Sequence, residues 1–115
     1  MKKNILIIDD SALMRRVLSD IINESSNYQV VYTATDGIAG LKILEEHNDI
    51  HVIFLDIHMP KMDGIEFLEV AKRKNINVDT FVFSSIATKD GEETMRALEL
   101  GALDFISKPT NILSN

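Results

Sequence analysis

Residues 53–64, IFLDIHMPKMDG, decide the fold of this chain. An unbroken apolar run ends at one carboxylate, Asp56, and Pro60, Asp63 and Gly64 follow shortly after it. Apolar runs without alternation are typical of strands that are buried on both faces of a parallel sheet. Pro, Asp and Gly together are typical of a loop. The stretch therefore predicts a buried strand that carries Asp56 to the edge of a sheet.

Similar apolar runs alternate with amphipathic segments along the whole chain. The runs predict strands at residues 4–8, 28–34, 50–55, 78–84 and 103–107. The amphipathic segments predict helices at residues 13–22, 37–47, 65–74 and 92–100. Ser11 is a candidate N-cap for the first helix, and Gly101 is a natural residue to end the last. Strands separated by helices run parallel, so residues 1–115 are predicted to form a single α/β domain with helices on both faces of the sheet.

The composition of the 115 residues excludes several classes of function. Its 45% hydrophobic and 26% charged residues are ordinary for a globular domain. A net charge of -6 argues against direct nucleic-acid binding, which needs a basic face. No apolar run approaches the roughly 20 residues that cross a membrane. The absence of Cys excludes a disulfide framework and a thiolate metal site, and is compatible with a reducing cytoplasm.

Functional groups of open parallel sheets gather beyond the carboxyl ends of the strands. At these positions the sequence has Asp9, Asp10, Asp56, Ser84 or Ser85, and Lys108. The second strand ends at Thr35 and Asp36, which rank lower because that strand is expected at an edge of the sheet. Three carboxylates, a hydroxyl and one ammonium are thus predicted to converge on one rim.

Such a rim suits metal-assisted phosphoryl transfer. Neighbouring carboxylates repel each other, and a hard divalent cation with oxygen ligands, Mg²⁺, relieves that repulsion. One carboxylate oxygen of these aspartates could then attack phosphorus, while Lys108 neutralises the phosphoryl oxygens and Ser84 donates a hydrogen bond. Each of these residues alone is more often a strand end, a cap or a surface side chain. Their placement together at the ends of four strands favours a functional site over separate structural roles.

Two other features have ordinary interpretations. His47, His51 and His58 lack zinc-ligand spacing and are expected on the surface. The basic run AKRKN at residues 71–75 could dock a partner, but a solvated helix face is the default expectation.

In four blocks the sequence resembles the receiver domain of two-component response regulators. The blocks are LIIDDSALMR, IFLDIHMPKMDG, FVFSS and ALELGALDFISKP, in this order over nearly the whole chain. The resemblance implies a flavodoxin-like three-layer sandwich with strand order 2-1-3-4-5. Receivers carry a fifth helix, which is expected to be absent or truncated here, so an N-terminal fragment of a longer protein is expected.

The resemblance also implies roles for individual residues. Asp56 would be the phosphoacceptor for a sensor histidine kinase, and Asp9, Asp10, Asp56 and the backbone carbonyl of His58 would hold Mg²⁺. Asp10 would be a direct ligand, whereas Asp9 would act through water. Lys108 would contact the phosphoryl group and precede a cis bond to Pro109.

The conformational switch implied by the resemblance uses Ser84, or Ser85, and Phe105. The hydroxyl would swing toward the phosphate and Phe105 would turn inward. Receivers often have Tyr in place of Phe105, so an output contact through that hydroxyl is in doubt. The chain would be a cytoplasmic signalling domain and not an enzyme.

The later blocks look most like the receiver of the chemotaxis protein-glutamate methylesterase, which makes a methylesterase the expected output domain. No Gly-x-Ser-x-Gly nucleophile turn occurs in the chain itself. A stand-alone chemotaxis receiver and a transcription-factor receiver are alternatives. An Mg²⁺-dependent aspartyl-phosphate phosphatase is disfavoured because His58 stands where such enzymes have a second Asp. A flavin mononucleotide binder is disfavoured because Asp9 and Asp10 stand where phosphate would bind.

Overall fold

The computed structural model describes residues 1–84 and 91–108. Strands and helices alternate along this part of the chain: β1 (Lys3–Ile8), α1 (Ala12–Asn23), β2 (Tyr28–Ala34), α2 (Gly37–Glu46), β3 (Val52–Asp56), α3 (Gly64–Arg73), β4 (Asp79–Ser84), α4 (Gly91–Glu99) and β5 (Asp104–Ser107). Every predicted element is confirmed, with boundaries that differ by at most two residues. The third strand includes Asp56 as its last residue, because Asp56 still pairs with Phe83 of β4.

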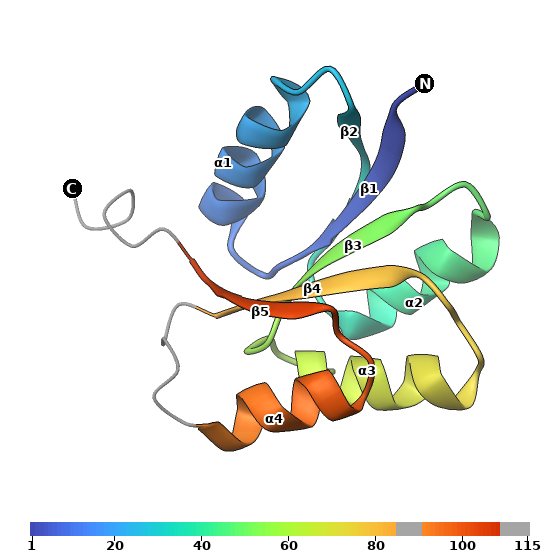
Figure 1. Cartoon of the computed structure of the whole chain (residues 1–115), viewed down its shortest axis with the longest axis vertical. Coiled ribbons are helices and arrows are strands. Elements are labelled where there is room, and N and C mark those ends of the chain that lie inside the picture. Colours follow the sequence, from blue (N-terminus) through green and yellow to red (C-terminus); the bar gives the residue numbers. More distant parts are fainter. Residues whose placement is uncertain (85–90, 109–115) are drawn as a thin grey trace.

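The five strands form one parallel sheet in the order β2-β1-β3-β4-β5. This confirms both the parallel direction and the strand order implied by the family resemblance. The carboxyl ends of β1, β3, β4 and β5 consequently lie at the same edge of the sheet (Figure 1).

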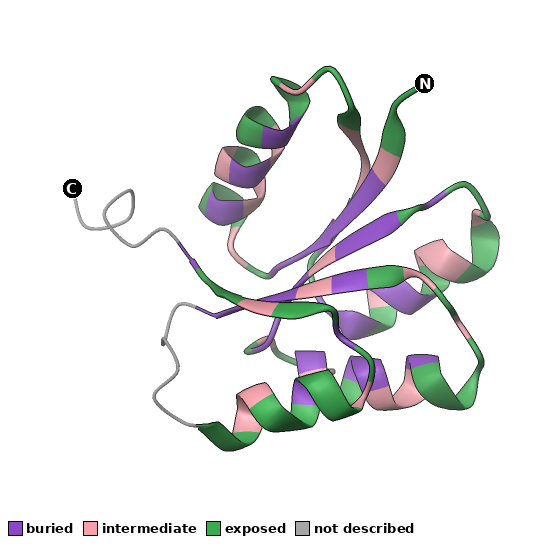
Figure 2. Cartoon of the chain, in the orientation of Figure 1, coloured by how far each residue is buried: buried purple, intermediate pink, exposed green. Residues whose placement is uncertain are grey.

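Helices cover the sheet unequally. Helix α1 packs on one face, whereas α2, α3 and α4 pack side by side on the other (Figure 1). Each face has its own apolar cluster. The larger cluster joins β1, β3 and β4 to α2, α3 and α4, and the smaller one joins the sheet to Met14, Leu18 and Ile22 of α1. Figure 2 shows the buried residues concentrated in the central strands and on the inner sides of the helices.

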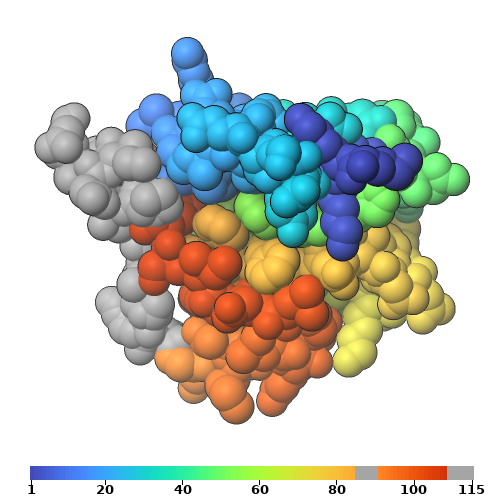
Figure 3. Space-filling view, turned by 45° about the horizontal axis from the view of Figure 1, so that its top comes forward, coloured from blue at the N-terminus to red at the C-terminus, as the bar shows by residue number. Residues whose placement is uncertain are grey.

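The buried stripe of α1 is narrower than its sequence pattern suggests. Leu13 and Ile21 belong to that pattern, yet they are 51% and 55% exposed. Because no described helix lies beside α1 on this face, only the stripe that points directly at the sheet is buried. Parts of β4 and β5 are visible between α1 and α4 in the space-filling view (Figure 3).

Within residues 1–84 and 91–108 the structure has four helices and no fifth, as expected. None of these four has both the length and the apolar character that a membrane-crossing helix requires. Ser85 and the expected cis bond between Lys108 and Pro109 lie outside the described residues.

Candidate functional site

The carboxyl edge of the sheet brings the predicted residues together. Asp9 directly follows β1, Asp56 ends β3, Ser84 ends β4 and Lys108 directly follows β5. The register places Asp56 opposite Phe83 and Ser84 opposite Ser107, so the four strands stop at nearly the same level. The convergence predicted from strand ends is therefore present in the structure.

Asp9 is 2% exposed, and hydrogen bonds hold both its side chain and its backbone. Its Oδ1 accepts a hydrogen bond from the backbone N–H of Ser11 at 2.9 Å, and its own carbonyl accepts one from the Arg15 guanidinium at 2.7 Å. Ser11 also caps α1, accepting from the N–H of Met14 at 3.1 Å. The start of α1 thus holds the Asp9 carboxylate in place.

Asp56 is 4% exposed, and the chain after it turns sharply back toward it. The N–H of Gly64 donates to the carbonyl of Ile57 at 2.9 Å. A Cβ at position 64 would lie 2.6 Å from the Asp56 carbonyl oxygen, so only glycine fits there. Asp63 and Glu66 then start α3 with reciprocal hydrogen bonds, a capping box. The Pro, Asp and Gly that follow the strand in the sequence therefore lie in this turn.

Lys108 joins the first and third strands. Its Nζ lies 2.9 Å from Oδ2 of Asp9 and 3.3 Å from Oδ1 of Asp56, and all three side chains are nearly inaccessible to solvent. Its backbone N–H donates to the carbonyl of Ser84 at 2.9 Å, which extends the pairing of β5 with β4 beyond the strands. One ammonium therefore compensates two buried carboxylates.

This compensation is incomplete. Burial and the nearby Asp9 carboxylate raise the pKa of Asp56 from 3.8 to about 6, against the lowering effect of Lys108 and of the His58 N–H. The His58 N–H donates to Oδ1 of Asp56 at 3.4 Å, a long and weak bond. The site therefore has excess negative charge, which a further cation would neutralise.

Three carboxylates at this edge are arranged to share such a cation. One oxygen from each of Asp9, Asp10 and Asp56 lies within 4.8 Å of the other two, and Asp10 is the solvent-exposed member. All-oxygen donors with access to water suit Mg²⁺. Among the described residues this is the one such group, and it contains none of His47, His51 and His58.

The structure does not favour a phosphatase that needs an acid two residues after Asp56. That position is His58, whose Nε2 lies 3.3 Å from Oε1 of Glu93 at the start of α4. The side chain thus contacts α4 and is not a carboxylic acid.

The remaining predicted residues occupy nearby positions. Ser84 is fully buried at the end of β4, and Phe105 of β5 pairs with Val82 and packs, partly buried, against the larger apolar cluster. Asp36, which ranked lower in the sequence, accepts from the N–H of Ala39 at 2.9 Å. It caps α2 and is therefore part of the scaffold.

Arg15 is a residue of the site that the sequence pattern did not reveal. Its periodicity places it on the polar side of α1, which predicts an exposed side chain. In the structure it is partly buried and bound to the carbonyl of Asp9. Its one sequence signal is its position one turn after the helix cap that follows the two aspartates.

Comparison with known proteins supports this geometry. The family description "response regulator receiver domain" matches residues 5–113. A protein-glutamate methylesterase/protein-glutamine glutaminase from Photorhabdus laumondii is 45% identical over 108 residues, which are 94% of this chain and 30% of that protein. The chain thus spans about a third of the length of such curated relatives.

Two solved structures share the fold. The response regulator domain of Thermotoga maritima CheB has a TM-score of 0.86 and 38% identity, covering 95% of this chain and 80% of that one. The second is described as the P1 domain of CheA3 in complex with CheY6 from R. sphaeroides. Its TM-score is 0.78 at 35% identity, covering 97% of this chain and 91% of that one. The strand order, the acidic edge and these matches agree, and the chain belongs to the response regulator receiver domain family.

Proposed function

We propose that this chain is a phosphorylatable switch that accepts a phosphoryl group on Asp56 from a histidine of a sensor kinase. One observation carries the proposal. Asp56 is buried at a strand end, shares a potential cation site with Asp9 and Asp10, and lies 3.3 Å from the Lys108 ammonium. A nucleophile, a cation site and a fixed positive charge are the parts that phosphoryl transfer to a carboxylate needs.

The donor set fits Mg²⁺. Asp9, Asp10, Asp56 and the carbonyl of His58 would hold the ion, as the family resemblance implies. When bound, Mg²⁺ supplies neutralisation of the charge on the phosphoryl oxygens. Because the pKa of Asp56 is raised by burial and by Asp9, a bound cation would also keep Asp56 ionised and available as a nucleophile.

The residues of the chain have separate tasks in the transfer. An Asp56 carboxylate oxygen forms the new bond to phosphorus, and the bond from phosphorus to the donor imidazole nitrogen breaks, its electron pair remaining on the imidazole. The Lys108 ammonium, held by Asp9 at 2.9 Å, attracts the phosphoryl oxygens. Ser84 would donate its hydroxyl to the product.

The switch would operate through β4 and β5. Val82 pairs with Phe105 and Ser84 with Ser107, so Ser84 and Phe105 lie on neighbouring strands and on the same face of the sheet. Movement of Ser84 toward a phosphate would change the packing available to Phe105. Phosphorylation would then shift a two-state equilibrium through contacts that exist in one state only.

The proposed pathway is a chemotaxis phosphorelay in the cytoplasm. The partners would be a sensor histidine kinase and an output domain, for which a methylesterase is the first candidate because the curated relatives bear that name. The solved structure that contains the P1 domain of CheA3 together with CheY6 supports a partner of the CheA type. A stand-alone chemotaxis receiver or a transcription-factor receiver are the alternatives. Any methylesterase activity would reside outside these 115 residues.

Intact-mass spectrometry after incubation with acetyl phosphate tests the chemistry. We expect a single phosphoryl adduct that requires Mg²⁺ and disappears in Asp56→Asn. Asp63→Asn is the matched control, because Asp63 lies in the same loop and Asn caps a helix as well as Asp. An adduct that persists in Asp56→Asn, or no adduct on folded protein with Mg²⁺, would contradict the proposal.

A second variant separates metal binding from switching. Lys108→Ala should still bind Mg²⁺ through the carboxylates, but its phosphorylated form should leave the NMR signals of the Phe105 ring unchanged. A normal response of Phe105 in that variant would remove Lys108 from the switch.

A further inference from the structure

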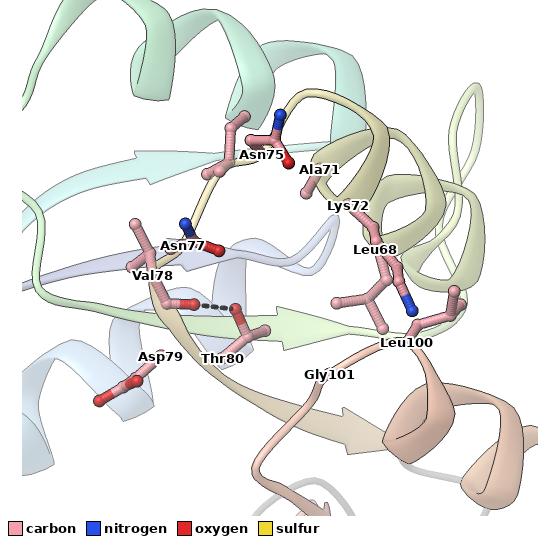
Figure 4. Close-up of a pocket in the computed structure, with 11 residues that line it drawn as sticks. Leu68, Ala71, Lys72, Asn75, Asn77, Val78, Asp79, Thr80, Leu100 and Gly101 are labelled. Carbon is pink, nitrogen blue, oxygen red and sulfur yellow. Dashed lines mark hydrogen bonds between the residues drawn. The ribbon is translucent and has the colours of Figure 1, made fainter.

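A surface hollow lies at the opposite edge of the sheet from Asp56. It has a volume of about 480 Å³ and is formed by the end of α3, the connection to β4 and the connection from α4 to β5 (Figure 4). Its apolar lining comes from Leu68, Ala71, Ile76, Val78 and Leu100. Because β4 begins at Asp79, beside this hollow, the phosphoryl chemistry at the end of β4 does not use it.

Positive side chains without ion-pair partners border this hollow. Lys72 lines it and also lines an adjoining hollow of about 550 Å³, which Arg73 shares. In Figure 4 the Lys72 side chain extends past Leu68 toward Leu100. Both cations are exposed, and neither forms an ion pair with any residue in the described ranges.

The neighbouring charges are already engaged or distant. Lys74 binds Glu45 at 2.8 Å, so the last cation of the basic run links α3 to α2. Glu69 is held by Arg96 at 3.0 Å. Asp79 lies at the end of the hollow away from Lys72 (Figure 4). On a chain with a net charge of -6, Lys72 and Arg73 thus have no ion-pair partner within the described residues, and both lie beside this hollow.

Two amide side chains complete the rim. Asn75 lies two residues beyond the end of α3 in a left-handed conformation, φ 56, and Asn77 lies two residues further along the chain. Both are exposed, and their side chains form no hydrogen bond within the described part of the chain. An apolar floor with a rim of free donors and acceptors is the usual anatomy of a protein-docking site.

The polar groups of the hollow fit a peptide better than a small molecule. Small-molecule sites bury most of their ligand around a few enclosed polar groups. Here the buried hydroxyl of Thr80 already donates to the Val78 carbonyl at 3.0 Å, and the other polar side chains are at the exposed rim. An extended segment can place one side chain in the hollow while its backbone meets Asn75 and Asn77.

We propose that this surface, the apolar hollow with Lys72, Arg73, Asn75 and Asn77, docks an acidic segment of a partner protein. One apolar side chain of the segment would sit against Leu100, and flanking carboxylates would meet Lys72 and Arg73. The site is independent of phosphorylation at Asp56. A receiver bound in this way keeps its acidic edge open to a kinase.

A panel of labelled octapeptides tests the proposal with the 115-residue chain. Each peptide carries Asp or Glu on both sides of a single Leu, Phe or Trp, and a parallel panel carries Lys in place of the acids. Fluorescence polarisation gives affinity, and amide NMR shifts give the location. We expect binding by acidic peptides only, with the largest shifts at Ile76, Val78 and Leu100.

Charge-reversal variants supply the controls. Lys72→Glu with Arg73→Glu should weaken binding on the order of tenfold, since two exposed ion pairs become repulsive. Lys72→Gln with Arg73→Gln should give a smaller loss and guards against a folding defect. Lys42→Glu, an exposed lysine on α2, should bind like the unaltered chain.

Several outcomes would overturn the proposal. One is that no acidic peptide shifts the amide signals of Ile76, Val78 and Leu100. Another is that the charge-reversed variant binds acidic peptides as tightly as the unaltered chain. A third is that the Lys peptides bind as tightly as the acidic peptides. Shifts confined to the Asp56 edge would likewise exclude this surface.

Discussion

Replacing Asp56 with Asn should stabilise the metal-free protein by about 3 kcal/mol above neutral pH. The pKa of Asp56 is about 6 in the folded chain, against an ordinary value of 3.8, because the carboxylate is buried beside Asp9. Each pKa unit between the folded and unfolded states corresponds to about 1.4 kcal/mol, which gives about 3 kcal/mol in total. Asn keeps the shape of Asp56 without its charge, and Lys108 still has Asp9 at 2.9 Å.

The sign of this effect is opposite to that of a salt-bridged carboxylate. Between pH 3.8 and about 6 the folded chain binds more protons at Asp56 than the unfolded chain. The free energy of unfolding therefore falls as the pH rises through this window, and the loss is complete above the folded-state pKa. Asp56→Asn removes this contribution, so its advantage should be near zero at about pH 4 and full above about pH 7.

Urea unfolding followed by circular dichroism, in EDTA and across this pH range, measures the difference between variant and parent. Asp20→Asn is the control, since Asp20 is exposed on α1 and its removal should leave the pH profile unchanged. Mg²⁺ should restore stability to the parent and have less effect on Asp56→Asn. A difference that does not depend on pH, or a variant less stable than the parent at neutral pH, would refute the reasoning.

Two further substitutions test the scaffold, each with a matched control and each measured by urea unfolding. Gly64→Ala should cost about 1–3 kcal/mol, because its Cβ would lie 2.6 Å from the backbone oxygen of Asp56. Gly91→Ala, with no atom within 4 Å, should be neutral or stabilising by up to about 1 kcal/mol. Met14→Ala should cost about 2–5 kcal/mol because Met14 is completely buried, whereas Leu13→Ala on the half-exposed stripe should stay within about 0.5 kcal/mol. Equal costs within either pair would contradict the assigned packing.

Much of the site could be predicted from the chain order alone. Asp9, Asp10, Asp56, Ser84 and Lys108 all follow or end apolar runs, and parallel strands present such positions at one edge. The strand order could not be predicted in this way, because it depends on which crossovers pass over which face of the sheet. It came from the family resemblance and was confirmed by the pairing of β1 with both β2 and β3.

Other contacts could not be predicted because they join side chains through space. Arg15 looked like a solvated residue of an amphipathic helix, yet it binds the carbonyl of Asp9. Leu13 looked like a core residue, yet it is half exposed because α1 is the only described helix on its face. In both cases helical periodicity gives the direction of a side chain but not what lies opposite to it.

The alternation of strands and helices, and the residues at which the strands end, can be read from the amino-acid order. These are local properties, since burial on both faces or on one face leaves its period in the chain. The position of Lys108 beside both Asp9 and Asp56, and the raised pKa of Asp56 in spite of that ammonium, depend on the folded arrangement. Distances between segments from opposite ends of the chain, and the burial that sets their electrostatics, exist only once the sheet has assembled.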